Sequence, residues 1–150
     1  MPTARSSRFA LFFAAALLLS ASARAEIRAL DPWARLQPPS SSMSAAFVVL
    51  ENTGKEADAL IGAACDCSEV VELHVMQEVD GQMSMRQVER FEIPAGSKVE
   101  LAPGGSHLML IHLKGPLSEA KPIHLELRFE HAPALAVDVP VRDPRAATGK

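Results

Sequence analysis

The chain alternates between short apolar or alternating runs and clusters of turn-forming residues. After residue 44, eight such runs span 45–50, 59–64, 70–79, 82–93, 98–101, 107–113, 123–129 and 135–141. None has a 3.6-residue periodicity, and Pro and Gly separate them, as at Pro94-Ala95-Gly96 and Pro103-Gly104-Gly105. Short runs with frequent turn signals are typical of an all-β sandwich or barrel, which we predict for a single domain.

Asp80-Gly81, between two of these runs, predicts a β-hairpin with a two-residue turn. A type I′ turn needs positive φ at both central residues, and Asp-Gly adopts this geometry readily. The resulting register places Met76 opposite Met85 and Glu78 opposite Met83. Because side chains alternate along a strand, the opposite face carries the aliphatic residues that we expect to pack on the core. These are Val71, Leu73, Val75, Val79 and Val88.

The polar face of this hairpin and a later run carry a set of potential metal ligands. In chain order they are His74, Met76, Met83, Met85, His107 and Met109. Imidazole nitrogen and thioether sulfur form a soft ligand set, and the thioethers indicate copper(I). His107 and Met109 lie two residues apart on a predicted strand, so they point to the same side.

Four of these residues follow a fixed spacing: His74, ten residues, Met85, twenty-one residues, His107, one residue, Met109. This motif resembles that of the periplasmic copper chaperone family PCuAC. The similarity extends to Asp31-Pro32-Trp33-Ala34-Arg35, Glu51-Asn52-Thr53-Gly54, Pro94-Ala95-Gly96 and the segment 103–109.

The resemblance implies a Greek-key β-sandwich similar to cupredoxins. It also implies a copper(I) site formed by His74, Met85, His107 and Met109. The expected partner is a copper-accepting protein, either the oxidase subunit that carries the Cu-A centre of cytochrome c oxidase or another copper chaperone.

Four other sulfur-containing residues are considered as auxiliary ligands: Met76, Met83, Cys65 and Cys67. Met76 and Met83 are expected either to assist the metal or to line the rim of its site. Cys65 and Cys67 leave three alternatives open: a strained or reversible disulfide, a pair of copper-binding thiolates, or a structural role. The family motif does not include these cysteines.

The N-terminus predicts export. Arg5 and Arg8 precede the apolar run 9–19, and Ala23-Arg24-Ala25 is a small-x-small cleavage signal. We therefore interpret residues 1–25 as a signal peptide for periplasmic localisation, residues 26–142 as the copper-binding domain and residues 143–150 as a flexible tail. The apolar run is shorter than the roughly 20 residues that span a bilayer, so stable membrane insertion is not expected.

Charge and missing motifs exclude several function classes. The net charge is −3, and signal-peptide removal takes away three arginines, so the remaining acidic domain is not expected to bind nucleic acid. No Ser-His-Asp set or paired catalytic carboxylates stand out, and we predict a binding protein that is not an enzyme. Two alternatives remain: a thiol-disulfide reductant that uses Cys65 and Cys67, and an electron-transfer cupredoxin, although neither cysteine lies in the His/Met segment.

Overall fold

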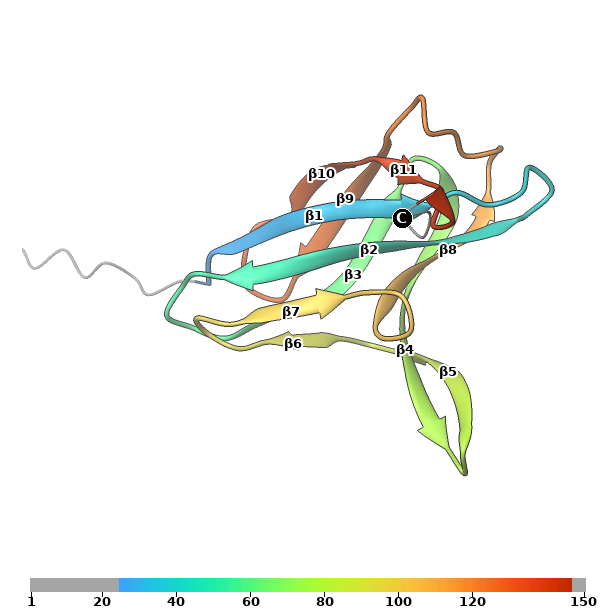
Figure 1. The fold of residues 1–150 in the computed structure, drawn as a ribbon. Helices are drawn as coiled ribbons and strands as arrows, with labels where there is room; N and C mark the ends of the chain where they lie inside the picture. The colour runs from blue at the N-terminus through green and yellow to red at the C-terminus, as the bar shows by residue number, and fades with distance from the viewer. Residues whose placement is uncertain (1–24, 147–150) are drawn as a thin grey trace, which may run out of the picture.

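The computed structural model describes residues 25–146, which form two β-sheets packed face to face (Figure 1). The larger sheet has the order β11 (Val141–Arg142), β1 (Ile27–Arg35), β2 (Met43–Asn52), β8 (His107–Leu113), β4 (Ser68–Val79) and β5 (Gln82–Val88), and β7 (Lys98–Leu101) also pairs with β2. The smaller sheet has the order β10 (Leu135–Val139), β9 (Ile123–Phe129), β3 (Asp58–Cys65) and β6 (Phe91–Ile93). No helix within residues 25–146 is long and apolar enough to cross a membrane.

The strand order confirms the predicted all-β sandwich. β8 lies between β2 and β4, so neighbouring strands are distant in sequence, as in Greek-key arrangements. Adjacent strands are antiparallel except for β1 and β11, which pair in parallel. The signal peptide was predicted for residues 1–25, of which residues 1–24 lie outside the described residues, as does the last part of the predicted tail, residues 147–150.

Three predicted runs match β7, β8 and β9 in both bounds. The run 82–93 is divided into β5 and β6, and the run 135–141 is divided at Pro140, which has no N–H for a strand ladder. The sequence pattern missed β1. This strand contains Pro32, and its register against β2 shifts between Leu30 and Trp33 at a bulge where Asp31 has φ of 45°. Such a bulge obscures the alternation of side chains on which strand prediction depends.

The core lies between the two sheets and takes every second side chain of most strands. In β9, for example, Ile123, Leu125, Leu127 and Phe129 are buried, and the residues between them are exposed. From the larger sheet, Leu73, Leu108 and Leu110 are buried in the same core. The remaining side chains of β4 and β8 therefore point to the outer face of the larger sheet, and these include His74 and His107.

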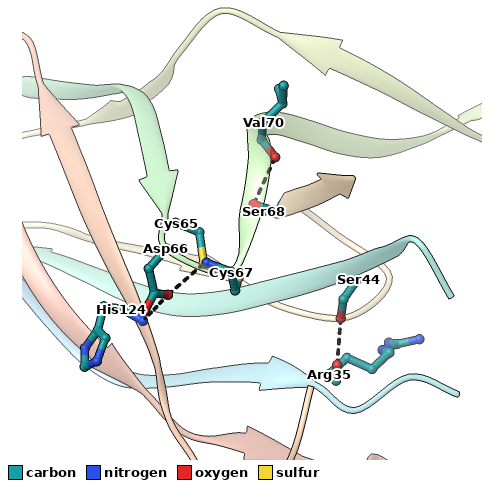
Figure 2. The surroundings of a disulfide bond; sticks show 8 residues. All are labelled: Arg35, Ser44, Cys65, Asp66, Cys67, Ser68, Val70 and His124. Carbon is teal, nitrogen blue, oxygen red and sulfur yellow. Dashed lines mark hydrogen bonds between the residues drawn. A yellow bond between two sulfur atoms is a disulfide. The ribbon is translucent and has the colours of Figure 1, made fainter. Parts of the chain in front are cut away.

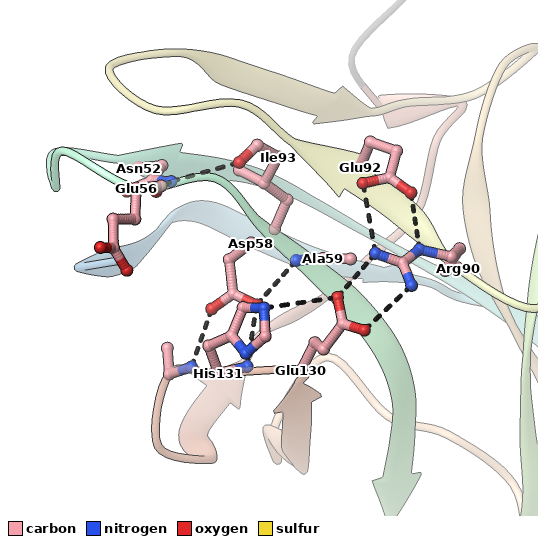
Figure 3. Close-up of polar contacts among 10 residues, drawn as sticks. Asn52, Glu56, Asp58, Ala59, Arg90, Glu92, Ile93, Glu130 and His131 are labelled. Atoms are coloured by element: carbon pink, nitrogen blue, oxygen red, sulfur yellow. Dashed lines mark hydrogen bonds and ion pairs between the residues drawn. The ribbon is translucent and has the colours of Figure 1, made fainter. Parts of the chain in front are cut away.

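Asp58 is the buried acidic residue that connects the start of β3 to the loop after β9. It is 2 % exposed, and its carboxylate accepts hydrogen bonds from the backbone N–H groups of Ala59, His131 and Ala132 (Figure 3). Nearby, the exposed Arg90 guanidinium contacts Glu92 and Glu130. Exposed ion pairs contribute little to stability, whereas the Asp58 carboxylate satisfies three amide donors.

Burial of Asp58 by itself would raise the pKa of its carboxyl group, but hydrogen bonds from Ala132, Ala59 and His131 lower the pKa below the ordinary 3.8. A lowered folded-state pKa means that the unfolded chain binds the proton more tightly. The stabilisation is therefore complete above the unfolded-state pKa and is lost as pH falls through the folded-state pKa.

We predict that Asp58→Asn lowers the free energy of unfolding by about 1–3 kcal/mol at neutral pH, because the charged acceptor is lost. The difference from wild type should shrink as pH falls below 3.8. Urea unfolding of both proteins between pH 7 and pH 2.5 measures this difference. A difference that is constant over this range would contradict the role assigned to the carboxylate charge.

Candidate metal centre

The β4–β5 hairpin has the geometry predicted from Asp80-Gly81. The two residues have φ values of 51° and 78°, and the register pairs Met76 with Met85 and Glu78 with Met83. The hairpin extends away from the body of the sandwich (Figure 1). For this reason Val79, which we expected to pack on the core, is 44 % exposed.

β8 supplies the second half of the site because it pairs with the other edge of β4. His74 lies directly opposite His107, and the centroids of their imidazole rings are 5.8 Å apart. His107 is 7 % exposed and the side chain of His74 is 13 % exposed. Two imidazoles from distant parts of the sequence therefore lie side by side on the outer face of the larger sheet.

The hydrogen bond of His107 determines which of its nitrogens is free. Nδ1 lies 3.0 Å from the carbonyl oxygen of Gly105. A carbonyl oxygen can only accept, so Nδ1 of the neutral ring carries the proton. Nε2 then keeps its lone pair and is able to bind a metal ion.

His74 has the opposite arrangement. Its Nε2 lies 2.9 Å from a carboxylate oxygen of Glu72, which can only accept, so Nε2 carries the proton. Nδ1 therefore has a free lone pair, and this atom is buried without a hydrogen-bond partner. An unsatisfied buried acceptor is costly, and a metal ion bound there would remove the cost.

The predicted thioether ligands lie on both sides of this histidine pair. Met109 is opposite Glu72, two residues before His74 on β4, whereas Met85 is opposite Met76, two residues after it. The register therefore puts all four motif residues on one face of the sheet. Met85 and Met109 are on opposite sides of the pair, because their partners on β4 are two residues after and two residues before His74.

Met76 lies next to His107, although it is not part of the four-residue motif. It lines a pocket of about 220 Å³ together with His107, Pro103 and Gly104. Its backbone N–H also donates a 3.3 Å hydrogen bond to the carbonyl oxygen of Gly105. Met83 is farther out on the hairpin and is 58 % exposed.

Sequence reasoning missed the contacts that two neighbours make with the imidazoles. Glu72 is two residues before His74 on a strand, so alternation already predicted that both side chains share a face, but it did not predict the hydrogen bond between them. No sequence pattern indicated that Phe47 lies near the imidazoles. Its ring centroid is 6.4 Å from that of His107 and 4.5 Å from that of Trp33. These contacts depend on the pairing of β1, β2 and β8. Phe47 is 3 % exposed and shields one side of His107.

Cys65 and Cys67 form a disulfide in the turn between β3 and β4 (Figure 2). The carboxylate of Asp66 lies near both sulfurs, and it also accepts a hydrogen bond from the backbone N–H of His124. Ser68 pairs with Leu113 at this end of β4, whereas His74 pairs with His107, so β4 separates the disulfide from the histidines by roughly 20 Å. Of the three alternatives that the sequence left open for Cys65 and Cys67, this structure has the disulfide, and it lies away from the histidine pair.

Comparison with protein families matches the chain to the family described as "Putative lipoprotein LpqE-like" over residues 27–141. The chain belongs to this family. Among curated proteins, "Putative lipoprotein Lxx21020" of Leifsonia xyli subsp. xyli is 40% identical over 104 residues. That match includes 69% of this chain and 63% of the relative, so the chain spans less than two thirds of the relative's length.

Solved structures similar to this chain include PCuAC domains, which confirms the resemblance deduced from the sequence. The copper-bound PCuAC domain from PmoF2 aligns with a TM-score of 0.68 and 24% identity, covering 81% of this chain and 97% of that domain. The apo PCuAC domain from PmoF1 gives 0.69 and 20% identity with the same coverage. CuI-DR1885 from Deinococcus radiodurans gives 0.64 and 26% identity, covering 87% of each chain.

We predict opposite tautomers for the two histidines of the metal-free protein at alkaline pH. Long-range ¹H–¹⁵N NMR spectra should show the proton on Nε2 of His74 and on Nδ1 of His107. Glu72→Ala should give His74 a mixture of tautomers, because the acceptor is lost, whereas Glu72→Gln keeps an acceptor oxygen and should preserve the Nε2 proton. Protonation of His74 at Nδ1 in the wild type would be incompatible with the assigned hydrogen bond.

Proposed function

We propose that this protein binds copper(I) through His74, Met85, His107 and Met109 and delivers it to other proteins. The observation that carries the proposal is the buried, unpaired Nδ1 of His74 beside His107, on a sheet face that also carries thioethers. Imidazole nitrogen and thioether sulfur are both neutral ligands, and the thioethers favour the soft, singly charged cuprous ion.

Copper in solved relatives supports this choice of metal. One neighbour with this fold is a copper-bound PCuAC domain, and another is the CuI form of DR1885. The donor set of this chain also fits the ion. Each histidine has one nitrogen held by a hydrogen bond to an oxygen acceptor, and such contacts orient a ligand ring and fix its tautomer before the metal arrives.

Delivery requires that the bound ion be released. Met85 is 46 % exposed, so an acceptor's ligand can approach the copper from the hairpin side while the histidines still hold it. The site has no thiolate, and an acceptor with thiolate ligands therefore holds copper(I) more tightly than these neutral groups do. We propose the Cu-A centre of cytochrome c oxidase, or another copper chaperone, as that acceptor.

An extracytoplasmic location is consistent with three observations. The sequence predicts a signal peptide, the family is described as lipoprotein-like, and Cys65 is joined to Cys67 in a disulfide. Disulfides persist mainly in oxidising compartments. Since both cysteines of the chain are in this bond within the domain, neither is a free thiol in this structure.

The electron-transfer alternative is less compatible with the arrangement of the site. A blue-copper centre combines two histidines with one cysteine thiolate. Both cysteines of this chain lie at the far end of β4, and each is in the disulfide. A mononuclear site at His74 and His107 therefore has no cysteine ligand from this chain.

We predict that Met85→Leu and Met109→Leu each weaken copper(I) binding by roughly tenfold or more. Loss of a group that only hydrogen-bonds to a metal ligand already weakens metal binding by about that factor. Leucine keeps the apolar volume and removes the sulfur, so the fold should persist. Competition titration against a chromophoric copper(I) chelator under anaerobic conditions measures the affinity. Met43→Leu is the matched control, because Met43 is 44 % exposed and lies outside the motif. Wild-type affinity in both motif variants would refute thioether ligation.

We predict that the copper(I)-loaded protein transfers its metal to the reduced, metal-free soluble domain that carries the Cu-A site. Copper analysis of the two proteins after chromatographic separation measures the transfer. Transfer should be lost when the acceptor's cysteines are replaced by serine. Copper retained by the donor with the intact acceptor would exclude Cu-A as the direct target, although copper(I) binding itself would stand.

A further inference from the structure

Every methionine in the described residues lies on the outer face of the larger sheet. Met43 pairs with Ile111, two residues beyond Met109 on β8, and Met76, Met85 and Met83 follow one another on the hairpin at the other side of the histidine pair. Core-facing positions of the same strands carry leucine and valine. The hairpin group contains two thioethers, Met76 and Met83, that the four-residue site does not use.

The three hairpin thioethers form a graded series from solvent to the histidines. Met83 is 58 % exposed, Met85 is 46 % exposed, and Met76 is partly buried and lines the pocket of His107. Met85 and Met76 are direct cross-strand partners, with Cβ atoms about 4.5–5.5 Å apart in such pairs. Met83 and Met85 are two residues apart on β5, about 6.5–7 Å along the strand.

These spacings allow neighbouring sulfurs to hold one copper ion together. A methionine side chain is unbranched and has three rotatable bonds, so two thioethers at these separations can both reach an ion between them. Movement from one residue to the next then forms one copper–sulfur bond as another breaks, and copper stays in the +1 state throughout. No free ion and no electron are released at any step.

We propose that Met83 is the outermost ligand of a thioether path through which copper(I) enters and leaves, passing Met85 and Met76 to reach His74 and His107. This inference rests on the proposed copper(I) binding. Glu78 is directly opposite Met83 on the same face, so a carboxylate accompanies the exposed thioether and attracts the cation. The hairpin extends beyond the sandwich (Figure 1), and Met83 near its tip is 58 % exposed.

Met83 has no evident structural role that would account for its position. Its side chain is mostly in solvent, and the hairpin register is set by the Asp80-Gly81 turn and by the ladder between β4 and β5. Met83→Leu should therefore keep the fold and the four-residue site. Met43→Leu is the matched control: Met43 has comparable exposure on the same sheet face but lines a groove with Met109 and Ser41, away from the hairpin.

The test separates rate from affinity. Stopped-flow mixing of each copper(I)-loaded protein with excess bathocuproine disulfonate gives the release rate, and competition titration gives the dissociation constant. We expect Met83→Leu to slow release by roughly tenfold, as loss of one transition-state ligand would. Its dissociation constant should stay within about twofold of wild type. Copper enters and leaves by the same path, so the substitution slows binding and release by the same factor. Met43→Leu should match wild type in both quantities.

NMR of ¹³C-methyl-labelled methionine supplies an independent readout. With less than one equivalent of copper(I), the ε-methyl signal of Met83 should broaden by exchange together with those of Met85 and Met76, and that of Met43 should stay sharp. Wild-type release by Met83→Leu, or equal slowing by Met43→Leu, overturns the path. A large loss of affinity in Met83→Leu also overturns it, since Met83 would then be a resident ligand. Failure of wild type to bind copper(I) at all would instead refute the proposed function.

Discussion

The antiparallel pairing of β4 with β8 is the interaction on which the site depends. Its ladder brings His74 opposite His107, and the same ladder directs Leu73 and Leu108 into the core on the other face. The hydrogen bonds and apolar packing that stabilise the sandwich therefore also fix the separation of the two imidazoles. A shift of the pairing by one residue would move one histidine into the core and a leucine to the surface, so the core protects the site's geometry.

Around this pair, short-range contacts determine what the imidazoles can do. Glu72 and the carbonyl oxygen of Gly105 each accept a hydrogen bond from one ring nitrogen, of His74 and His107 respectively. The other nitrogen of each ring therefore keeps its lone pair for a metal ion. Phe47 covers one side of His107 and limits access of water. The rings are thus oriented by the protein in the metal-free state, and such preorganisation lowers the cost of binding because little has to be ordered when the ion arrives.

The two kinds of proposed ligand occupy different parts of the structure. The histidines belong to the continuous sheet, where β4 has a partner strand on each side, whereas Met83 and Met85 belong to the hairpin beyond it, where β4 pairs with β5 alone. Ligands in the sheet are suited to holding a metal, and exposed thioethers are suited to exchanging it. The disulfide at the opposite end of β4 is outside this arrangement, since Ser68 and His74 are separated by half the strand.

The sequence by itself determined the local structure. Asp80-Gly81 specified the hairpin and the Met76–Met85 register, because turn geometry restricts the backbone of only a few residues. Alternation indicated most strands and the face on which the candidate ligands lie, but Pro32 and the neighbouring bulge concealed β1. Only the tertiary structure decided that β8 lies beside β4 and that the cysteines lie far from the histidines. Such pairings connect distant segments and are selected by the packing of the whole core, which no local pattern contains.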